Sequence, residues 1–223
     1  MTQHLSYKVS LQRLPSALLG SVILFFLLLS FTAQANLVEE ERTAPAAWDG
    51  QFWLVMPLDE GDSGAYYQAH QSSARYLYDA LGWGWPTKKI SAEVNLDMVR
   101  HHISQHQLRD SFTYVVRARG ERAIAGAIYV NQVNSERRHV PNFEPREFAA
   151  EVTFWFTEQT EASEHADLLI SEVLTWIEQE WQFPAVLLPV NKNYHFIHQE
   201  MRKLEYEPFS EDGDSGEQLY RLP

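Results

Sequence analysis

The chain has 223 residues, of which 45% are hydrophobic and 13% are aromatic. This length and composition allow one sizeable buried core, so we expect one domain. The formal net charge of -12 argues against a sequence-independent grip on nucleic acid, which needs clustered Lys and Arg. The absence of cysteine excludes disulfides, thiolate metal sites, a cysteine nucleophile and a lipid-modified N-terminal cysteine.

The N-terminal segment has the pattern of a secretory signal peptide. Lys8 and Arg13 precede an uncharged apolar run over 14–33, and Ala33-Gln34-Ala35 follows as a small-x-small cleavage pattern. We therefore expect residues 1–35 to be a signal peptide and the rest of the chain to be exported, periplasmic or secreted. An uncleaved anchor is the alternative, because the run is long enough to cross a bilayer. A translation start further downstream is a third possibility.

The first predicted elements follow a polar linker over 36–50. The segment "QFWLVMPL", residues 51–58, predicts a strand that ends near its proline. One helix is then predicted by apolar positions at helical spacing, with Gly82 as its C-terminal stop. These positions are His70, Ala74, Leu77 and Leu81. The aromatic segment "GWGWP" that follows is a loop.

The central elements are a helix, a hairpin, a strand and another helix. Asn95 predicts the N-cap of the second helix, whose inner face carries Leu96, Val99, Ile103 and His106. Two β-rich runs around Gly120 predict a hairpin. The segment "EFAAEVTFWFT" predicts the fourth strand, and amphipathic spacing predicts a third helix. The apolar positions of that helix are Leu169, Val173, Trp176 and Ile177.

The C-terminal elements complete a mixed sheet. "AVLLPV" is typical of a strand that is buried on both faces, and "NYHFIHQEMRKL" predicts a fourth helix. The segments 205–209 and 217–222 predict a closing hairpin with a flexible tip. The predicted order is β-α-α-β-β-β-α-β-α-β-β, an α/β fold with helices on both faces of the sheet.

This order resembles the GNAT superfamily of CoA-dependent N-acetyltransferases. The resemblance covers residues 51–209 and depends on the hairpin leading into "AEVTFWF", the helix "ADLLISEVLTWI", the strand "AVLLPV" and the segment "NKNYHFIHQEMRKLEYE". It implies a domain over 51–223 with a mixed, mostly antiparallel sheet. It also implies transfer of an acetyl or other acyl group from acetyl-CoA or another acyl-CoA to the primary amine of a small molecule or peptide.

The loop that opens the third helix departs from the family pattern. Family members place the CoA pyrophosphate on a loop with Gln or Arg, two residues, Gly, one residue, then Gly or Ala. These positions fall on Glu161, Glu164 and Ala166, so only the last one matches. Carboxylates stabilise a helix start, which Ser163 is placed to cap, but they repel a pyrophosphate. The alternative function is therefore an exported, non-catalytic GNAT-fold binding module that has lost CoA binding.

The resemblance assigns binding roles to a second group of residues. The strand backbone around Phe156 and Thr157 would hold the pantetheine arm of CoA, and Ala166 stands at the pyrophosphate loop. Asn191 follows the fifth strand, where family members commonly carry an Asn, and would hold pantetheine or a reacting water.

The resemblance also implies catalytic roles. Glu151 stands where many family members hold the carboxylate that deprotonates the amine, which requires a pKa raised by partial burial. Its alternative is a solvated glutamate on an outer strand face. The general acid of the family is a tyrosine on the fourth helix, and the candidates here are Tyr194 and His198, with His195 beside them.

Trp83 and Trp85 flank a glycine in the loop "LGWGWP". In the family topology this loop overhangs the acceptor side of the cleft, where aromatic residues recognise substrate. The alternative is a lid over the edge of the core.

Two groups of histidines are candidate metal ligands. His195 and His198 share a helix face, and so do His102 and His106, with His101 adjacent. A metal site needs at least three converging ligands, and neither group signals a third. We therefore expect no metal.

Overall fold

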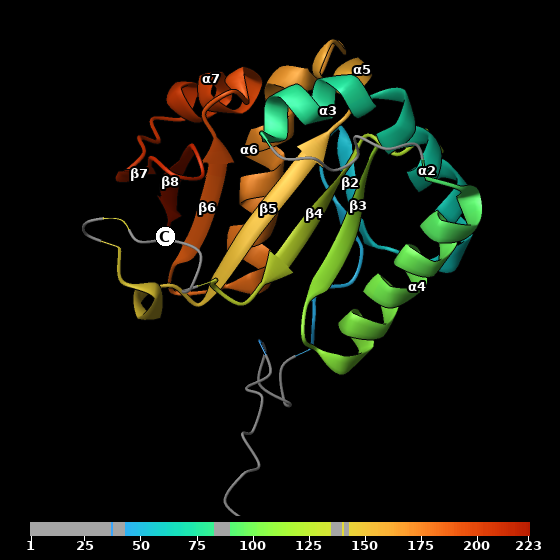
Figure 1. The fold of residues 1–223 in the computed structure, drawn as a ribbon, viewed down its shortest axis with the longest axis horizontal. Helices are drawn as coiled ribbons and strands as arrows, with labels where there is room; N and C mark the ends of the chain where they lie inside the picture. The colour runs from blue at the N-terminus through green and yellow to red at the C-terminus, as the bar shows by residue number, and fades with distance from the viewer. Residues whose placement is uncertain (1–36, 38–42, 83–89, 135–139, 141–142) are drawn as a thin grey trace, which may run out of the picture. The chain divides into compact units, whose positions relative to one another are not determined.

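The structure is a computed structural model that describes residues 37, 43–82, 90–134, 140 and 143–223. Within these residues, eight strands form one sheet in the order β1-β2-β3-β4-β5-β6-β8-β7 (Figure 1). The strands are β1 (Trp48–Asp49), β2 (Trp53–Pro57), β3 (Phe112–Ala118), β4 (Gly126–Asn131), β5 (Ala150–Phe156), β6 (Val186–Asn191), β7 (Ser210–Asp212) and β8 (Glu217–Leu222). Neighbouring strands are antiparallel except β5 and β6, which are parallel. The predicted mixed, mostly antiparallel sheet is confirmed.

The helices flank this sheet. They are α2 (Ser63–Ser72), α3 (Ala74–Leu81), α4 (Ala92–Leu108), α5 (Glu158–Glu161), α6 (Ala166–Trp176) and α7 (His195–Lys203). Single turns of 3-10 helix are η1 (Glu60–Asp62) and η2 (Pro145–Glu147), and η3 (Ile177–Trp181) is a π-helical turn after α6. No helix in the described part of the chain combines the length and the apolar character needed to cross a membrane.

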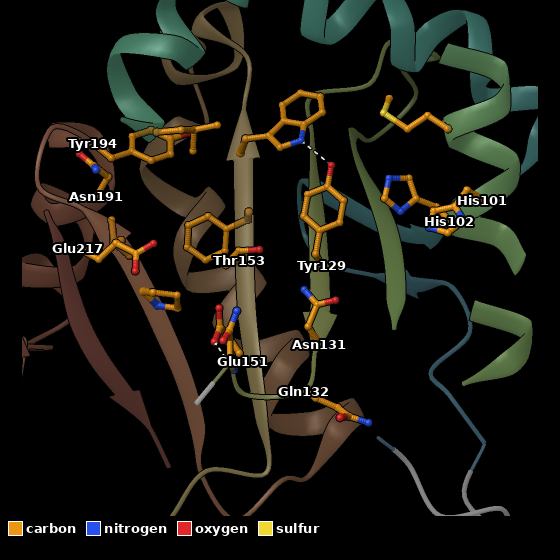
Figure 2. A pocket seen from close by; sticks show the side chains of 17 residues that line it. His101, His102, Tyr129, Asn131, Gln132, Glu151, Thr153, Asn191, Tyr194 and Glu217 are labelled. Atoms are coloured by element: carbon orange, nitrogen blue, oxygen red, sulfur yellow. Dashed lines mark hydrogen bonds between the residues drawn. The ribbon is translucent and has the colours of Figure 1, made fainter. Parts of the chain in front are cut away.

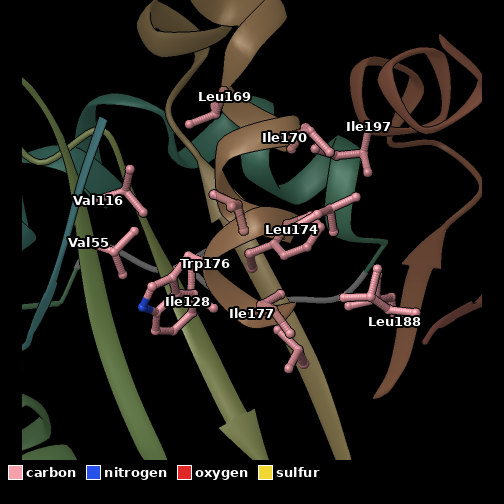
Figure 3. Close-up of a cluster of buried hydrophobic side chains, with 14 of the residues drawn as sticks. Val55, Val116, Ile128, Leu169, Ile170, Leu174, Trp176, Ile177, Leu188 and Ile197 are labelled. Atoms are coloured by element: carbon pink, nitrogen blue, oxygen red, sulfur yellow. The ribbon is translucent and has the colours of Figure 1, made fainter. Parts of the chain in front are cut away.

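Side chains alternate between two cores on the two faces of the sheet, because successive residues of a strand point to opposite sides. On β5, Val152, Phe154 and Phe156 belong to the larger core with α6 and α7. Figure 3 shows this core, in which Leu174 and Trp176 of α6 lie among side chains of the sheet. The opposite face packs against α2 and α4 in a second core. The odd-numbered positions of β5 therefore face away from α6.

The parallel pair β5 and β6 is joined over a short distance only. Its register pairs are Ala150 with Val186 and Glu151 with Leu187. Beyond these pairs the two strands separate, as Figure 1 shows at the ends of their arrows. The side chain of Tyr194, which precedes α7, lies in this split, since its hydroxyl accepts a hydrogen bond from the Phe156 N–H at 3.0 Å.

The single helix predicted to end at Gly82 is two helices. Ser73 separates α2 from α3 with φ -105° and ψ 11°, and its hydroxyl accepts a hydrogen bond from the Glu158 N–H at 3.2 Å. The helix is thus interrupted where Ser73 bonds to α5, and the helical spacing of apolar residues did not predict this interruption. The predicted stop is confirmed, because Gly82 has φ 69° and its N–H donates to the Tyr78 carbonyl.

The predicted cap of the next helix was wrong. Ser91 is the N-cap of α4, and its Oγ accepts from the Val94 N–H. Asn95 lies inside the helix and is 1% exposed. Its Oδ1 lies 3.0 Å from His70 Nε2, and its Nδ2 donates to the Ser63 carbonyl at 2.9 Å. The residue that resembled a cap therefore joins α4 to α2.

Other departures are small. The predicted linker over 36–50 contains the two-residue strand β1, and the first strand of the closing hairpin lies over 210–212 instead of 205–209. The four-residue helix α5 was not predicted. The signal peptide predicted over 1–35 lies outside the described residues.

Candidate functional site

A cavity of about 550 Å³ opens on the sheet face that carries α4 (Figure 2). Its walls come from the end of α3, from α4, from the second half of β4, from most of the length of β5, from the end of β6 and from the start of β8. The polar lining residues are His101, His102, Tyr129, Asn131, Gln132, Asn134, Glu151, Thr153, Asn191, Tyr194 and Glu217. We call it the acidic cavity, because the described part of its lining holds two carboxylates, Glu151 and Glu217, and no Lys or Arg. A site of this charge favours a cationic ligand over an anionic one.

Glu151 reaches the acidic cavity through the alternation of β5. Glu151, Thr153 and Trp155 share the face that turns away from α6, and all three line the cavity. Glu151 is 6% exposed, so the alternative of a solvated glutamate is wrong. The Asn134 N–H donates to its Oε2 at 3.2 Å, which fixes the carboxylate at the cavity wall.

Glu217 lies on the opposite side of the split from Glu151. It is 9% exposed, pairs with Asn191 in the β6–β8 register, and accepts a hydrogen bond from the Ser215 hydroxyl at 3.2 Å. Figure 2 shows its carboxylate pointing into the space between the strands. Glu217 was not predicted as a site residue, because nothing local in "GEQLYRL" indicates that β8 neighbours β6.

Tyr129 contributes a hydroxyl held by two aromatic neighbours. It accepts a hydrogen bond from Trp155 Nε1–H at 2.9 Å, and it also bonds the Tyr66 hydroxyl. Burial raises the pKa of Tyr129, so its hydroxyl keeps its proton at neutral pH. Tyr129 and Asn131 could have been found from the sequence, because alternate positions of "GAIYVN" share one face of the strand.

The α4 histidines lie at the cavity without forming a metal centre. His102 Nδ1 is 3.3 Å from the Thr113 hydroxyl, and burial, assisted by neighbouring His101, lowers the pKa of His102 to about 4. His106 instead packs against the rings of Phe112 and Tyr114. Among the described residues, no group of three or more His, Cys, Asp or Glu side chains is placed to hold a metal ion.

The two candidate acids have different positions. Tyr194 is 2% exposed and lines the acidic cavity. Burial raises the pKa of Tyr194, and the adjacent charge of Glu161 raises it further. His198 is not among the lining residues, and His195 is exposed.

His198 links α7 to the sheet. Its Nε2 lies 2.9 Å from the Asn191 carbonyl, and its Nδ1 lies 2.7 Å from the Tyr220 hydroxyl. A carbonyl only accepts, so Nε2–H donates to it, and Nδ1 accepts from the tyrosine. Burial lowers the pKa of His198, and the neutral ring is thereby held in one tautomer.

Asn191 lines the cavity and also shapes the turn after β6. Its Oδ1 accepts from the Asn193 N–H at 3.0 Å, and its Nδ2 is 3.4 Å from the Ser215 carbonyl. A Cβ at Gly82 would lie 2.2 Å from Nδ2. The side chain therefore packs against the end of α3, and its predicted ligand-holding role stays a prediction.

The backbone groups predicted to hold pantetheine are engaged within the protein. The Phe156 N–H donates to the Tyr194 hydroxyl, and the Thr157 N–H donates to the Ala125 carbonyl at 2.8 Å. Thr157 also caps α5, because its Oγ1 accepts from the Thr160 N–H at 3.1 Å. Neither N–H points freely into the split between β5 and β6.

The turn between β5 and α6 does not fit the diphosphate of CoA. Residues 157–166 include no Gly, Lys or Arg, whereas a diphosphate needs close backbone approach and positive charge. Glu161 accepts a hydrogen bond from the Tyr76 hydroxyl and also interacts with the Tyr194 hydroxyl. Burial raises the pKa of Glu161 to about 7. A carboxyl group, not an anion cradle, thus occupies this turn.

The start of α6 also differs from expectation. Ser163 does not cap it, because its hydroxyl donates to the Thr160 carbonyl at 2.6 Å. The helix begins at Ala166, which is buried, and the residue before it makes no side-chain cap. Trp83 and Trp85, predicted to contact substrate, lie outside the described residues.

Comparisons with known proteins identify the architecture. A scan against models of protein families finds no match, and neither does a search of curated proteins. Solved structures do match. One of them is RimL, a ribosomal L7/L12 alpha-N-protein acetyltransferase in complex with coenzyme A. It matches with a TM-score of 0.56 and 13% sequence identity, over 77% of this chain and 94% of that chain.

Two further matches are also acetyltransferases. The microcin C7 self immunity acetyltransferase MccE, in complex with acetyl-CoA and AMP, has a TM-score of 0.58 and 8% identity over 77% of this chain and 92% of its own. An acetyltransferase from Agrobacterium tumefaciens strain C58 has a TM-score of 0.53 and 15% identity over 83% of this chain and 99% of its own. At these identities the likeness concerns the fold alone. The chain therefore has the GNAT fold, as the order of its elements predicted.

Proposed function

We propose that the protein is an N-acyltransferase that moves an acyl group from a thioester to a primary amine bound in the acidic cavity. The observation that carries this proposal is the position of Glu151, a buried carboxylate on the cavity wall beside the split between β5 and β6. Among the residues that the structure describes, the lining has two carboxylates and no Lys or Arg. An alkylammonium ion is a ligand of matching charge.

The reaction follows from these groups. Glu151 takes a proton from the ammonium ion and frees the nitrogen lone pair. The amine then attacks the carbonyl carbon of the thioester, the C–S bond breaks, and the amide C–N bond remains. The second proton lost by the nitrogen goes to the leaving thiolate. Tyr194 is the candidate acid for that step, because it lines the cavity while His198 does not.

The chain's lack of cysteine makes a direct assay possible. Thiol released from an acetyl thioester can be followed with a thiol-reactive dye without background from the protein, and mass spectrometry identifies the acylated amine. Glu151→Gln should lower kcat/KM by about 10²–10⁴-fold, the usual contribution of a general base. Glu121→Gln, a matched change at an exposed hairpin glutamate, should leave kcat/KM within about twofold of the wild-type value.

A non-catalytic binding module is the second candidate, favoured by the engaged N–H groups and the acidic turn. It predicts that an alkylammonium ligand binds in a calorimetric titration while no thioester is consumed. Export is a separate proposal, supported by the signal-peptide pattern over 1–35. An export assay with and without that segment tests it.

A further inference from the structure

Three side chains from three elements meet at the end of the β5–β6 split that lies beside the turn before α6. They are Tyr76 from α3, Glu161 from α5 and Tyr194 at the start of α7, and we call them the Tyr–Glu cluster. The rings of Tyr76 and Tyr194 meet edge to face with centroids 6.4 Å apart. Both hydroxyls interact with the Glu161 carboxyl group. The cluster fills the end of the split with protein atoms.

The cluster also engages a backbone donor that the pantetheine arm of CoA would require. The Tyr194 hydroxyl accepts a hydrogen bond from the Phe156 N–H, which is on the β6 side of β5. Thr157 is turned toward β4, since its N–H donates to the Ala125 carbonyl. CoA would have to displace the bond between Tyr194 and Phe156, and its diphosphate would find no Lys or Arg within residues 157–166.

The surroundings of the Glu161 carboxyl group leave no place for a phosphate in the turn between β5 and α6. Glu161 Oε1 is buried and has no hydrogen-bond partner among the described residues. Glu158, one helical turn away, raises the pKa of Glu161 further by its negative charge. Bringing another anion to this place would add repulsion to the loss of space and of donors.

The acidic cavity, in contrast, remains open. Its volume of about 550 Å³ is within the range of about 300–1,000 Å³ that small-molecule sites have. It reaches Tyr194 on one side and Glu151 on the other. A short thioester and an amine can share this space without entering the turn before α6.

We infer that the acyl donor is a nucleotide-free thioester, recognised by its acyl and thioester groups and not by a nucleotide diphosphate. This inference rests on the proposed acyl transfer and names its donor class. The bonds are those given above: the thioester C–S bond breaks, the amide C–N bond forms, and the nitrogen releases two protons, one to Glu151 and one to the thiolate. No further reactant is needed.

The test compares three donors that share one acetyl thioester. Acetyl-CoA, S-acetylpantetheine and S-acetyl-N-acetylcysteamine are each supplied to the full chain with the same panel of primary amines. We expect kcat/KM for the three donors to agree within about fivefold, and calorimetry to detect no CoA binding up to millimolar concentration. An advantage of 100-fold or more for acetyl-CoA, or micromolar CoA binding, would overturn the donor inference and leave acyl transfer standing. Absence of product with every donor and amine would refute the proposed function, and the inference with it.

A variant pair tests whether the cluster is the barrier. Glu161→Arg combined with Glu164→Gly supplies positive charge and a glycine at the turn. The ratio of kcat/KM for acetyl-CoA to that for the cysteamine thioester should rise at least tenfold. This ratio does not depend on the fraction of protein that folds. Glu121→Arg makes a similar charge change on an exposed hairpin and should leave the ratio unchanged. An unchanged ratio in the double variant would show that the turn does not exclude the nucleotide, and would overturn the inference.

Discussion

Glu161→Gln should change how the stability of the protein depends on pH. The glutamine keeps the shape of the side chain and removes its titration. In the wild-type protein, burial raises the pKa of Glu161 from 4.5 to about 7, against opposing hydrogen bonds from Tyr76 and Tyr194. Between these two values the folded protein holds a proton that the unfolded chain has lost. The contribution of Glu161 is therefore fully present below pH 4.5 and is lost as the pH rises through about 7.

The size of the effect follows from the difference between the two pKa values. A difference of about 2.5 pH units corresponds to about 3.4 kcal/mol. Glu161 is only partly buried, so solvent screening lowers the expected change to about 1–2 kcal/mol. For a protein of this length each kcal/mol shifts Tm by about 2–4 °C.

Thermal unfolding of both proteins between pH 5 and pH 8 measures this change. Relative to wild type, the Glu161→Gln variant should gain about 2–8 °C in Tm as the pH rises from 5 to 8. Histidines titrate in both proteins and cancel in the difference. Glu164→Gln, an exposed glutamate of the same turn, is the control and should show no such gain. A constant difference between wild type and Glu161→Gln across this range would refute the claim that the partly buried carboxyl group of Glu161 holds a proton at this turn.

Three other predictions concern the core, a turn and the cavity. Leu174→Ala removes a 3% exposed side chain and should lower the free energy of unfolding in urea by about 2–5 kcal/mol. Gly82→Ala should lower the free energy of unfolding by at least about 1 kcal/mol more than Gly120→Ala in the same assay. Both glycines have positive φ, but of the two only Gly82 would place a Cβ in a clash, 2.2 Å from Asn191 Nδ2. The His102 ring should show no titration between pH 6 and pH 8 by NMR, because burial lowers its pKa to about 4; a midpoint near 6.5 would contradict the burial argument.

The sequence by itself predicted the features that local patterns encode. The alternation in "AEVTFWF" indicated β5, the spacing of Leu169, Val173 and Trp176 indicated α6, and Gly82 indicated the end of α3. These signals are local because periodicity reports which side of an element is buried. The order of elements was then sufficient to predict the GNAT fold.

The tertiary structure decided which side chains meet. Asn95 looked like a cap but joins two helices, and Glu217 faces the cavity because β8 pairs with β6. Glu161 was read from the sequence as a charged helix start, yet packing places it against Tyr76, a residue 85 positions earlier in the chain. Such contacts depend on strand order and on helix packing across the sheet, which no local pattern contains. For this reason the sequence predicted the fold and the candidate base, while the closed turn and the second carboxylate of the cavity emerged only from the structure.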